Sequence, residues 1–397
     1  MPSDPDAPTL ETLRHHVTTH HPRALERLAH LVNHDTPSLD AAANDAALRT
    51  LATWCEEHGA STERLSATAP HANHLAARWH ARGDARVHIL ILTHVDTVWP
   101  IDETTRRPFA IENDHATGPG IFDMKAGIIQ SLEAVDAFRS TRESDDADVT
   151  LLITSDEEVG SPTSRSHIER EARDASVVLV TEPSKEGALK TARKGVGMYR
   201  VQAMGRAAHA GLEPERGRSA ILEMARHIPT IDALNDPTCG TTVTVGTIAG
   251  GSARNVVAER CHIDVDVRTE TLEESARVHD ALMNLHAIDP DVTLTIEGGT
   301  NRPPMVRTAS TSRLYERAAA LARLLDEPVA ETMVGGGSDG NFTAALNRPT
   351  LDGLGAVGVG AHAQHERIDV QRSLLVRTTL LAGLLADLTL NGTPDAR

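Results

Sequence analysis

The chain has 397 residues, 3 cysteines and a formal charge of −17, and these numbers exclude several classes of protein. At roughly 100–200 residues per domain, the length predicts two or three domains. The 56 acidic against 39 basic residues argue against nucleic acid as a partner, because phosphate-binding surfaces need basic patches. No apolar stretch is expected to reach the roughly 20 residues of a membrane span, so no membrane partner is expected either.

The cellular compartment is predicted from the cysteines and the first residues. Cys55, Cys239 and Cys261 are odd in number and far apart, which is typical of proteins from a reducing compartment. The first six residues, MPSDPD, lack the basic and apolar regions of a signal peptide. We therefore expect a cytoplasmic protein.

The first half of the chain alternates between helix-like and strand-like segments. Helical periodicity marks residues 10–34, 40–59 and 125–138, and short apolar runs typical of buried strands mark residues 87–92, 149–154 and 177–180. Because strands and helices alternate along the chain, this half is predicted to form an α/β fold with a mostly parallel sheet.

A different pattern begins near Gly195 and predicts a second, smaller domain. Alternating strands are expected at residues 198–204 and 261–268, and amphipathic helices at residues 219–227 and 275–286. Four strands and two helices would fit a small α+β domain of about 110 residues. Helical periodicity then returns at 312–325. We therefore predict a domain at 194–303 inserted into a larger domain formed by residues 1–193 and 304–397.

The first strand-like run and the glycine turn after it are followed by residues that can bind a metal. His94 and Asp96 lie two residues apart and share one face of a strand. Asp96 could orient the imidazole of a metal-binding His94, although a lone His-x-Asp is more often incidental. Asp123 follows the turn at 118–120 and could be a ligand or simply a helix cap.

Carboxylates follow the other two strand-like runs. Residues 155–158 read Ser-Asp-Glu-Glu, and adjacent carboxylates suggest a bound cation or a raised pKa, whereas a solvated acidic turn explains them equally well. Glu182 follows the next run, and α/β sheets place their sites at the ends of parallel strands. With His362 the set holds two histidines and three carboxylates, too many for one tetrahedral zinc but suited to two metals that share a carboxylate.

In their order along the chain, these motifs resemble those of the M20 metallopeptidases. The motifs are His94-x-Asp96, Gly118-x-Gly120-x-x-Asp123-x-Lys125, Asp156-Glu157-Glu158, Glu182-Pro183 and His362. The resemblance is closest to the group of glutamate carboxypeptidase (carboxypeptidase G2), acetylornithine deacetylase and succinyl-diaminopimelate desuccinylase. It implies a mostly parallel-sheet di-zinc hydrolase domain, and it makes 194–303 a lid and dimerisation domain.

The resemblance also implies a ligand set. Asp123 would bridge two Zn²⁺ ions, for which Co²⁺ or Mn²⁺ could substitute. His94 and Glu182 would complete one site, and Glu158 and His362 would complete the other.

Further roles follow from the same resemblance. Glu157 would be the general base and Asp96 would hold His94. His209 would cross a dimer interface and stabilise the oxyanion in the other subunit. Asn255 and Arg268 match positions that contact substrate.

Two more residues are candidates for binding a substrate carboxylate, Arg302 and Lys190. For Arg268 and Arg302, a surface salt bridge is the alternative explanation, and for Arg302 it explains the residue equally well. The leading prediction is a homodimer that hydrolyses the amide bond of a small N-acyl or aminoacyl amino acid with a free carboxylate. The alternatives are a di-zinc aminopeptidase or dipeptidase that recognises a free amine, and a non-catalytic binding protein of the same fold.

Overall fold

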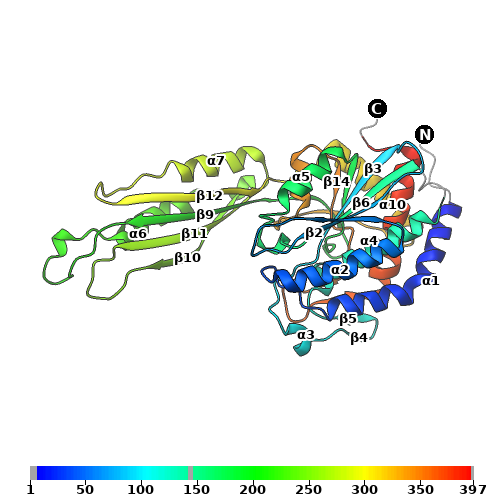
Figure 1. Cartoon of the computed structure of the whole chain (residues 1–397). Coiled ribbons are helices and arrows are strands. Elements are labelled where there is room, and N and C mark those ends of the chain that lie inside the picture. Colours follow the sequence, from blue (N-terminus) through cyan, green and yellow to red (C-terminus); the bar gives the residue numbers. More distant parts are fainter. Residues whose placement is uncertain (1–6, 142–145, 395–397) are drawn as a thin grey trace. The chain divides into compact units, whose positions relative to one another are not determined.

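The chain divides into two compact units, each described here by itself (Figure 1). The computed structural model describes residues 7–141 and 146–394. Unit 1 comprises Met1–Ala192, Arg307–Val334 and Ser338–Arg397, and unit 2 comprises Arg193–Val306 and Gly335–Gly337. The predicted inserted domain, 194–303, does not include the second segment of unit 2, Gly335–Gly337. The residues 1–6, on which the cytoplasmic expectation partly rests, lie outside the described residues.

Unit 1 is built on a six-stranded sheet with a parallel centre. The strand order is β1 (Ser61–Leu65), β2 (His74–Trp79), β6 (Ala147–Thr154), β3 (Val87–His94), β7 (Val177–Val180) and β14 (Thr350–Leu351). The last four strands pair in parallel, whereas β1 and β2 pair antiparallel. The expected α/β class with a mostly parallel sheet is therefore confirmed.

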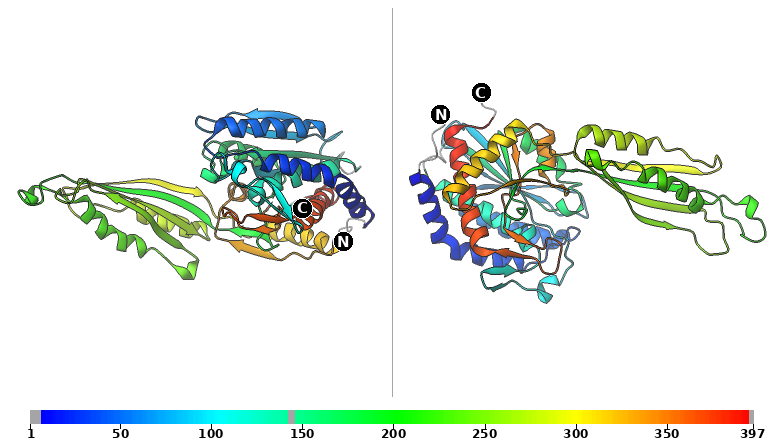
Figure 2. Two further views of the ribbon diagram at one scale, coloured as in Figure 1. Left: turned by 90° about the horizontal axis from the view of Figure 1, so that it is seen from below. Right: turned by 180° about the vertical axis from the view of Figure 1, so that it is seen from behind.

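Helices cover both faces of this sheet (Figure 2). Side chains alternate along β3, so Ile89 and Ile91 join one apolar cluster and Leu90 and Leu92 join the other. The first cluster includes residues of α1 (Ala7–Val32), α2 (Ala41–Glu57), α4 (Ala126–Arg139), α8 (Ala309–Leu324) and α10 (Thr378–Asn391), and the second includes residues of α5 (Arg165–Asp174) and α9 (Gly340–Ala345). Burial on both faces explains why the strands read as continuous apolar runs.

The C-terminal helical segment corrects one expectation. Gln371–Asn391, 21 residues long, is long and apolar enough to cross a membrane by length and composition alone. The prediction that no such stretch exists is therefore wrong. However, 83% of its most apolar window is buried inside the protein, and α10 packs against α1, α4 and α8. Burial in the core of unit 1 accounts for this composition, because helices that are apolar all round are found in cores as well as membranes.

Two smaller sheets and a short helix complete unit 1. They are a four-stranded sheet of β15 (Gly358–Val359), β16 (Arg367–Asp369), β5 (His115–Thr117) and β4 (Ala110–Glu112), a two-stranded sheet of β13 (Glu331–Val334) and β8 (Leu189–Arg193), and helix α3 (Glu103–Arg106). Arg193, at the end of β8, belongs to unit 2. The segment that carries His362 connects β15 to β16.

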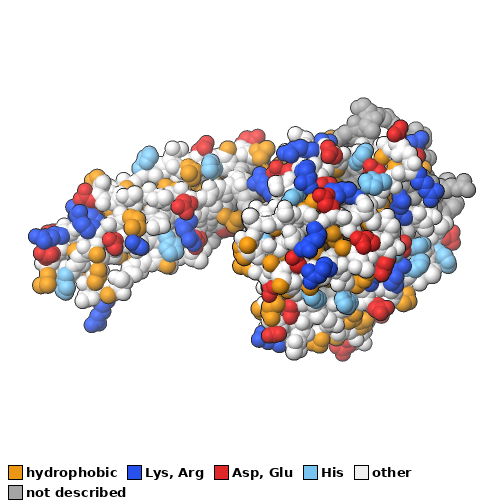
Figure 3. All heavy atoms as spheres, viewed as in Figure 1, with side chains coloured by type: hydrophobic (Ala, Val, Ile, Leu, Met, Phe, Trp, Pro, Cys, Tyr) orange, Lys and Arg blue, Asp and Glu red, His pale blue; other side chains and the backbone are white. Residues whose placement is uncertain are grey.

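Unit 2 is an antiparallel sheet with helices on one face. The strand order is β10 (Thr242–Gly250), β11 (Arg260–Thr269), β9 (Gly195–Met204) and β12 (Thr293–Arg302). Helices α6 (Ala220–Asp232) and α7 (Leu272–Met283) share an apolar cluster with β9, β10 and β11. The other face of the sheet is partly exposed, which explains the alternation of polar and apolar residues. On the faces visible in Figure 3, acidic and basic side chains are interspersed over both units.

Candidate metal centre

The carboxyl ends of β3, β6 and β7 bring predicted ligands together at one edge of the sheet. His94 is the last residue of β3, and the turn after β6 carries Glu157 and Glu158. Glu182 follows β7, the other neighbour of β3. Ligand atoms of His94, Glu157 and Glu182 lie within 4.8 Å of one another, and so do those of His94, Asp123 and Glu158. This is the edge where α/β folds place their sites.

Asp123 lies at the middle of the cluster, with one histidine on each side. Its Oδ1 is 3.3 Å from His94 Nε2, and its Oδ2 is 3.4 Å from His362 Nε2. The same His94 nitrogen is 3.4 Å from Glu182 Oε1, and the same His362 nitrogen is 3.0 Å from Glu158 Oε2. The five predicted ligands therefore form two groups that meet at one carboxylate.

The backbone around Asp123 does not support the helix-cap interpretation. Asp123 has non-helical angles (φ −119°, ψ 95°), and α4 begins only at Ala126. A Cβ at Gly120, where φ is +70°, would lie 2.5 Å from Thr97 Cγ2, so the turn requires glycine there. The turn is fixed further by Lys125, whose Nζ donates to the His34 carbonyl at 2.8 Å; burial lowers the pKa of Lys125 to about 8.

The state of His94 fits a metal ligand. Its Nδ1 lies 3.0 Å from the Asp96 carbonyl oxygen, which can only accept, so Nδ1 carries a proton. Nε2 is buried, faces Asp123 and Glu182, and has no hydrogen-bond partner among the described residues. Burial lowers the pKa of His94, but the carboxylates of Asp123, Asp96 and Glu182 raise it well above its usual range. Carboxylates around a buried ring nitrogen favour positive charge there, so these residues fit a divalent metal.

Electrostatics at the second group lead to the same conclusion. Burial raises the pKa of Glu158 to about 7, with His362 opposing and Asp123 adding to the shift. The carboxylates of Asp123 and Glu158 raise the pKa of His362 to about 10. The two histidine contacts outweigh burial and hold the pKa of Asp123 well below its usual range. The cluster therefore attracts positive charge near neutral pH.

Asp96 ties the end of β3 to the acidic turn. The carboxylate of Asp96 lies 3.4 Å from His94 Nδ1. The backbone carbonyl oxygen of Asp96 is closer to the same nitrogen, at 3.0 Å. The carboxylate accepts from the backbone N–H groups of Glu157 and Glu158 (3.2 Å each) and from Ser38 Oγ (2.7 Å). Because Glu158 is also largely buried, the segment is not the solvated acidic turn that composition alone allows.

Two buried carboxylates, for which the sequence predicted no role, accept hydrogen bonds from backbone segments next to the site. Glu366 accepts the backbone N–H groups of Gly120, Phe122 and Asp123 at 2.9–3.0 Å. Asp156 accepts from the backbone N–H and hydroxyl of Thr163 (2.7 and 2.6 Å). The only sequence feature that drew attention to Glu366 is its position four residues after His362. No local pattern indicated that its carboxylate would bind the backbone of the turn before Asp123.

The predicted substrate-binding residues fall into both units. Lys190, on β8, belongs to unit 1, and its Nζ lies 4.0 Å from Glu182 Oε2, beside the cluster. His209 and Asn255 belong to unit 2. These two are neighbours within that unit, since Ala210 N donates to the Asn255 carbonyl at 3.0 Å.

The two predicted carboxylate-binding arginines differ in their surroundings. Arg268 forms a two-pronged ion pair with Asp266 on the same strand, with both N···O distances 2.8 Å. This contact agrees with the salt-bridge explanation for Arg268. Arg302 is only 5% exposed, and its Nη1 donates to Asn301 Oδ1 at 3.0 Å, so this arginine does not lie on the surface.

The fold and the ligand cluster define a metal-dependent hydrolase of the α/β class. Residues 90–387 match the model of Peptidase family M20/M25/M40. The chain belongs to this family, as the resemblance implied, and is a metallohydrolase that acts on amide bonds. The alternative of a non-catalytic binding protein is therefore wrong.

Two relatives illustrate the similarity in sequence. The chain is 28% identical over 386 residues to carboxypeptidase G2 of Pseudomonas sp. (strain RS-16), covering 94% of this chain and 90% of the relative. It is 27% identical over 316 residues to succinyl-diaminopimelate desuccinylase of Dechloromonas aromatica (strain RCB), covering 74% and 81%. Both relatives belong to the group named from the motifs.

Two solved structures share the fold. Aminopeptidase PepT of Bacillus cereus ATCC 10987 has a TM-score of 0.69 at 20% identity and covers 93% of this chain and 98% of its own. The YXEP protein of Bacillus subtilis, a dinuclear metal-binding peptidase of the M20 family, has a TM-score of 0.67 at 15% identity and covers 94% and 99%.

Proposed function

We propose that this chain is a di-zinc hydrolase that cleaves the amide bond of a small N-acyl or aminoacyl amino acid with a free carboxylate. The observation that carries the proposal is Asp123, whose two oxygens face two different histidines. One ion would be held by His94, Asp123 and Glu182, and the other by Asp123, Glu158 and His362. The identity to carboxypeptidase G2 over almost the whole chain supports a substrate that bears a carboxylate.

The residues of the cluster divide the chemistry between them. When bound, the two ions would polarise the amide carbonyl and lower the pKa of a water molecule toward 7. Glu157 would accept a proton from the attacking water and donate it to the leaving amine. The backbone N–H of Glu157 donates to Asp96, which also contacts His94. Asp96 therefore positions both the proposed base and a proposed metal ligand.

Substrate recognition is proposed for four residues outside the ligand set. Arg268 or Arg302 would bind the substrate carboxylate, since a guanidinium presents paired N–H groups to it. Lys190, next to Glu182, and Asn255 would add polar contacts. In Arg268 one pair of N–H groups is already bound to Asp266, so this residue would have to exchange that ion pair for the substrate carboxylate.

We further propose a cytoplasmic homodimer that associates through unit 2. The edge strand β10 exposes Ile248, and α6 exposes Ile221 and Leu222, so an edge strand and a helix both present apolar side chains to solvent. His209, exposed on the same unit, would stabilise the oxyanion in the partner's active site. The three free cysteines support a reducing compartment.

The experiment that tests the proposal is amine release from a mixed substrate panel with zinc present, followed by mass spectrometry. The panel contains N-acyl amino acids, folyl-type glutamates and dipeptides, each as the free acid and as the C-terminal amide. Cleavage of acids but not amides supports the proposal. A demand for a free amine with indifference to the C-terminus would instead establish the aminopeptidase or dipeptidase alternative.

A further inference from the structure

A second cluster of metal-ligand side chains lies at the amino ends of the strands that carry the candidate metal centre. His88 is the second residue of β3, and Asp148 is the second residue of β6. His94 lies six residues farther along β3, which is roughly 20 Å at about 3.3 Å per residue. The two clusters are therefore separate sites at opposite ends of the sheet.

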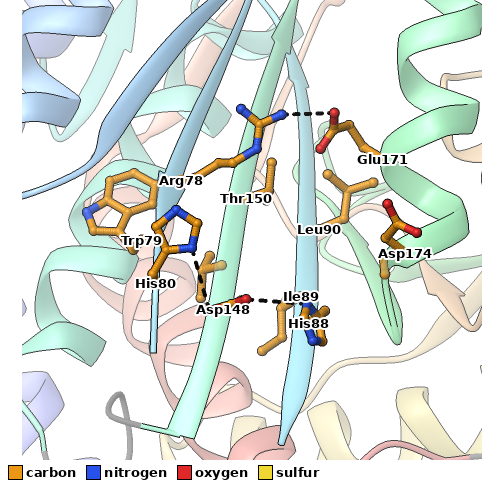
Figure 4. A pocket seen from close by; sticks show the side chains of 12 residues that line it. Arg78, Trp79, His80, His88, Ile89, Leu90, Asp148, Thr150, Glu171 and Asp174 are labelled. Atoms are coloured by element: carbon orange, nitrogen blue, oxygen red, sulfur yellow. Dashed lines mark hydrogen bonds and ion pairs between the residues drawn. The ribbon is translucent and has the colours of Figure 1, made fainter. Parts of the chain in front are cut away.

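The second cluster is a row of three side chains across three adjacent strands. His88 and Asp148 are direct partners in the parallel register, and His80 follows Trp79, which pairs with Val149. The Nδ1 atoms of His88 and His80 lie 3.5 and 3.8 Å from the two oxygens of Asp148. Figure 4 shows the carboxylate between the two imidazoles, which help to line a pocket of about 180 Å³.

The distances from Asp148 to the two histidines are longer than direct hydrogen bonds, and the two imidazoles would have to rotate before all three side chains could reach one ion. Hydrogen bonds between nitrogen and oxygen are typically 2.7–3.2 Å long, whereas two ligand atoms around a tetrahedral zinc with bonds of 2.0–2.2 Å lie about 3.4 Å apart. The side chains of His80 and His88 are 65% and 50% exposed, so they can rotate toward a common ion that enters from solvent. Asp148 is anchored, because its Oδ1 accepts the Ala81 N–H at 2.8 Å.

The charges around the pocket do not oppose a cation. Arg78 lines it, but its guanidinium is paired with Glu63 and Glu171, each at 2.9 Å. Asp174 also lines the pocket and adds a carboxylate.

A further group of ligand types, His16, His20 and Asp136, is less suitable for a cation. There Asp136 Oδ2 already accepts from Arg23 Nη2 at 2.6 Å. Asp136 Oδ1 lies 2.8 Å from His58 Nδ1. A metal ion would therefore have to displace a guanidinium from the carboxylate.

We propose that His80, His88 and Asp148 bind one divalent transition-metal ion independently of the catalytic centre. Imidazole and carboxylate ligands suit Zn²⁺, Ni²⁺, Co²⁺ and Cu²⁺ rather than Mg²⁺ or Ca²⁺. The ion would connect β3 and β6 to the residue that follows β2, at the edge of the sheet opposite the candidate active site.

The test is the number of zinc ions per chain after equilibrium dialysis against Zn²⁺, measured by elemental analysis. The variant His80→Ala/His88→Ala is expected to bind one ion fewer than the wild type. The control His115→Ala/His286→Ala removes two exposed histidines outside the cluster and should bind as many ions as the wild type. Because the difference is measured, the result does not depend on how many ions the catalytic centre holds.

A second variant separates loss of the site from loss of the fold. Asp148→Asn keeps an acceptor for the Ala81 N–H but removes the charge, so it should fold and also lose one ion. Amide hydrolysis by both variants should stay at the wild-type rate, since the site is remote from the catalytic cluster. Equal metal content in the wild type and both variants would overturn the proposal.

Discussion

Glu366 accepts the backbone N–H of Asp123 at 3.0 Å, although 243 residues separate the two in the chain. The same carboxylate accepts two more N–H groups of the Gly120–Asp123 turn. The proposed bridging ligand is therefore positioned by a residue that needs no contact with a metal. Partners that orient ligands in this way commonly contribute 10–100-fold to metal affinity or activity.

Glu366→Gln is expected to reduce zinc affinity or kcat/KM by about 10–100-fold. The amide nitrogen of glutamine cannot accept, so at least one backbone N–H of the turn would face a donor. Zinc affinity is measured by competition with a chelator, and folding by circular dichroism. Glu112→Gln, at an exposed position on β4, is the control. Full zinc affinity and turnover in the Gln variant would show that the turn holds Asp123 without this carboxylate.

Glu157→Ala is expected to lose turnover by about 10²–10⁴-fold, the usual contribution of a general base, while keeping its full zinc content. Glu158→Ala is the comparison and should lose zinc, because Glu158 contacts His362 in the ligand set. Elemental analysis and turnover are measured on the same samples. Loss of zinc from the Glu157 variant would mean that the roles of these two residues are assigned the wrong way round.

Removal of metal is expected to abolish activity reversibly. After exhaustive chelation, turnover should vanish, and added Zn²⁺ or Co²⁺ should restore it, because Glu157 alone cannot activate water for attack on an amide. Turnover is measured before chelation, after chelation and after each metal is returned. Activity that survives complete removal of metal would contradict the di-zinc proposal.

The pH dependence of stability is expected to depend on His74. This side chain is fully buried, and burial lowers its pKa to about 4. Below pH 6.5 the unfolded chain takes up a proton that the folded chain does not, so stability falls from pH 6.5 down to pH 4 and the effect levels off below. The shift corresponds to about 3 kcal/mol of unfolding free energy.

Urea unfolding at several pH values between 4 and 7.5 tests this expectation. His74→Gln should reduce the loss of unfolding free energy between pH 6.5 and pH 4 by about 3 kcal/mol. His115→Gln, at an exposed site, should lose as much stability over this range as the wild type. If the His74 variant and the wild type lost stability in parallel, other groups would be responsible for the pH dependence.

Dilution is expected to reduce activity once dimers dissociate, because His209 would act in the partner's site. Sedimentation gives the dimer fraction, and turnover is measured over the same concentrations. His209→Ala should lower turnover by about 10²–10³-fold, the cost of removing an oxyanion donor, without changing the dimer fraction. A fully active monomer would contradict the role of His209 in the partner's site.

Local sequence patterns predict the parts of this fold that are long or periodic. The apolar run at 177–180 coincides with β7, and the helical face at 125–138 lies within one residue of α4. The strands β4, β5, β15 and β16 have only two or three residues, too few for any period to show. Their pairing depends on tertiary contacts.

In the candidate site, too, residues with a local sequence pattern could be predicted, whereas residues that depend on distant contacts could not. His94, Asp123 and Glu182 could be predicted because each follows an apolar run or a glycine turn. Glu366 and Ser38 could not be assigned, since their partners Asp123 and Asp96 lie 243 and 58 residues away. Hydrogen bonds across such separations leave no local pattern in one sequence.

The three glycines 335–337 make unit 2 more than a simple insertion. They belong to unit 2, although the chain on both sides of them belongs to unit 1. A Cβ at Gly337 would lie 2.8 Å from Arg302 Cδ, so the glycine backbone packs directly against a buried guanidinium stem. A fragment cut at residues 193 and 306 would therefore lose part of the surface that covers Arg302. A chimaera that replaces unit 2 of this chain would have to replace both segments together.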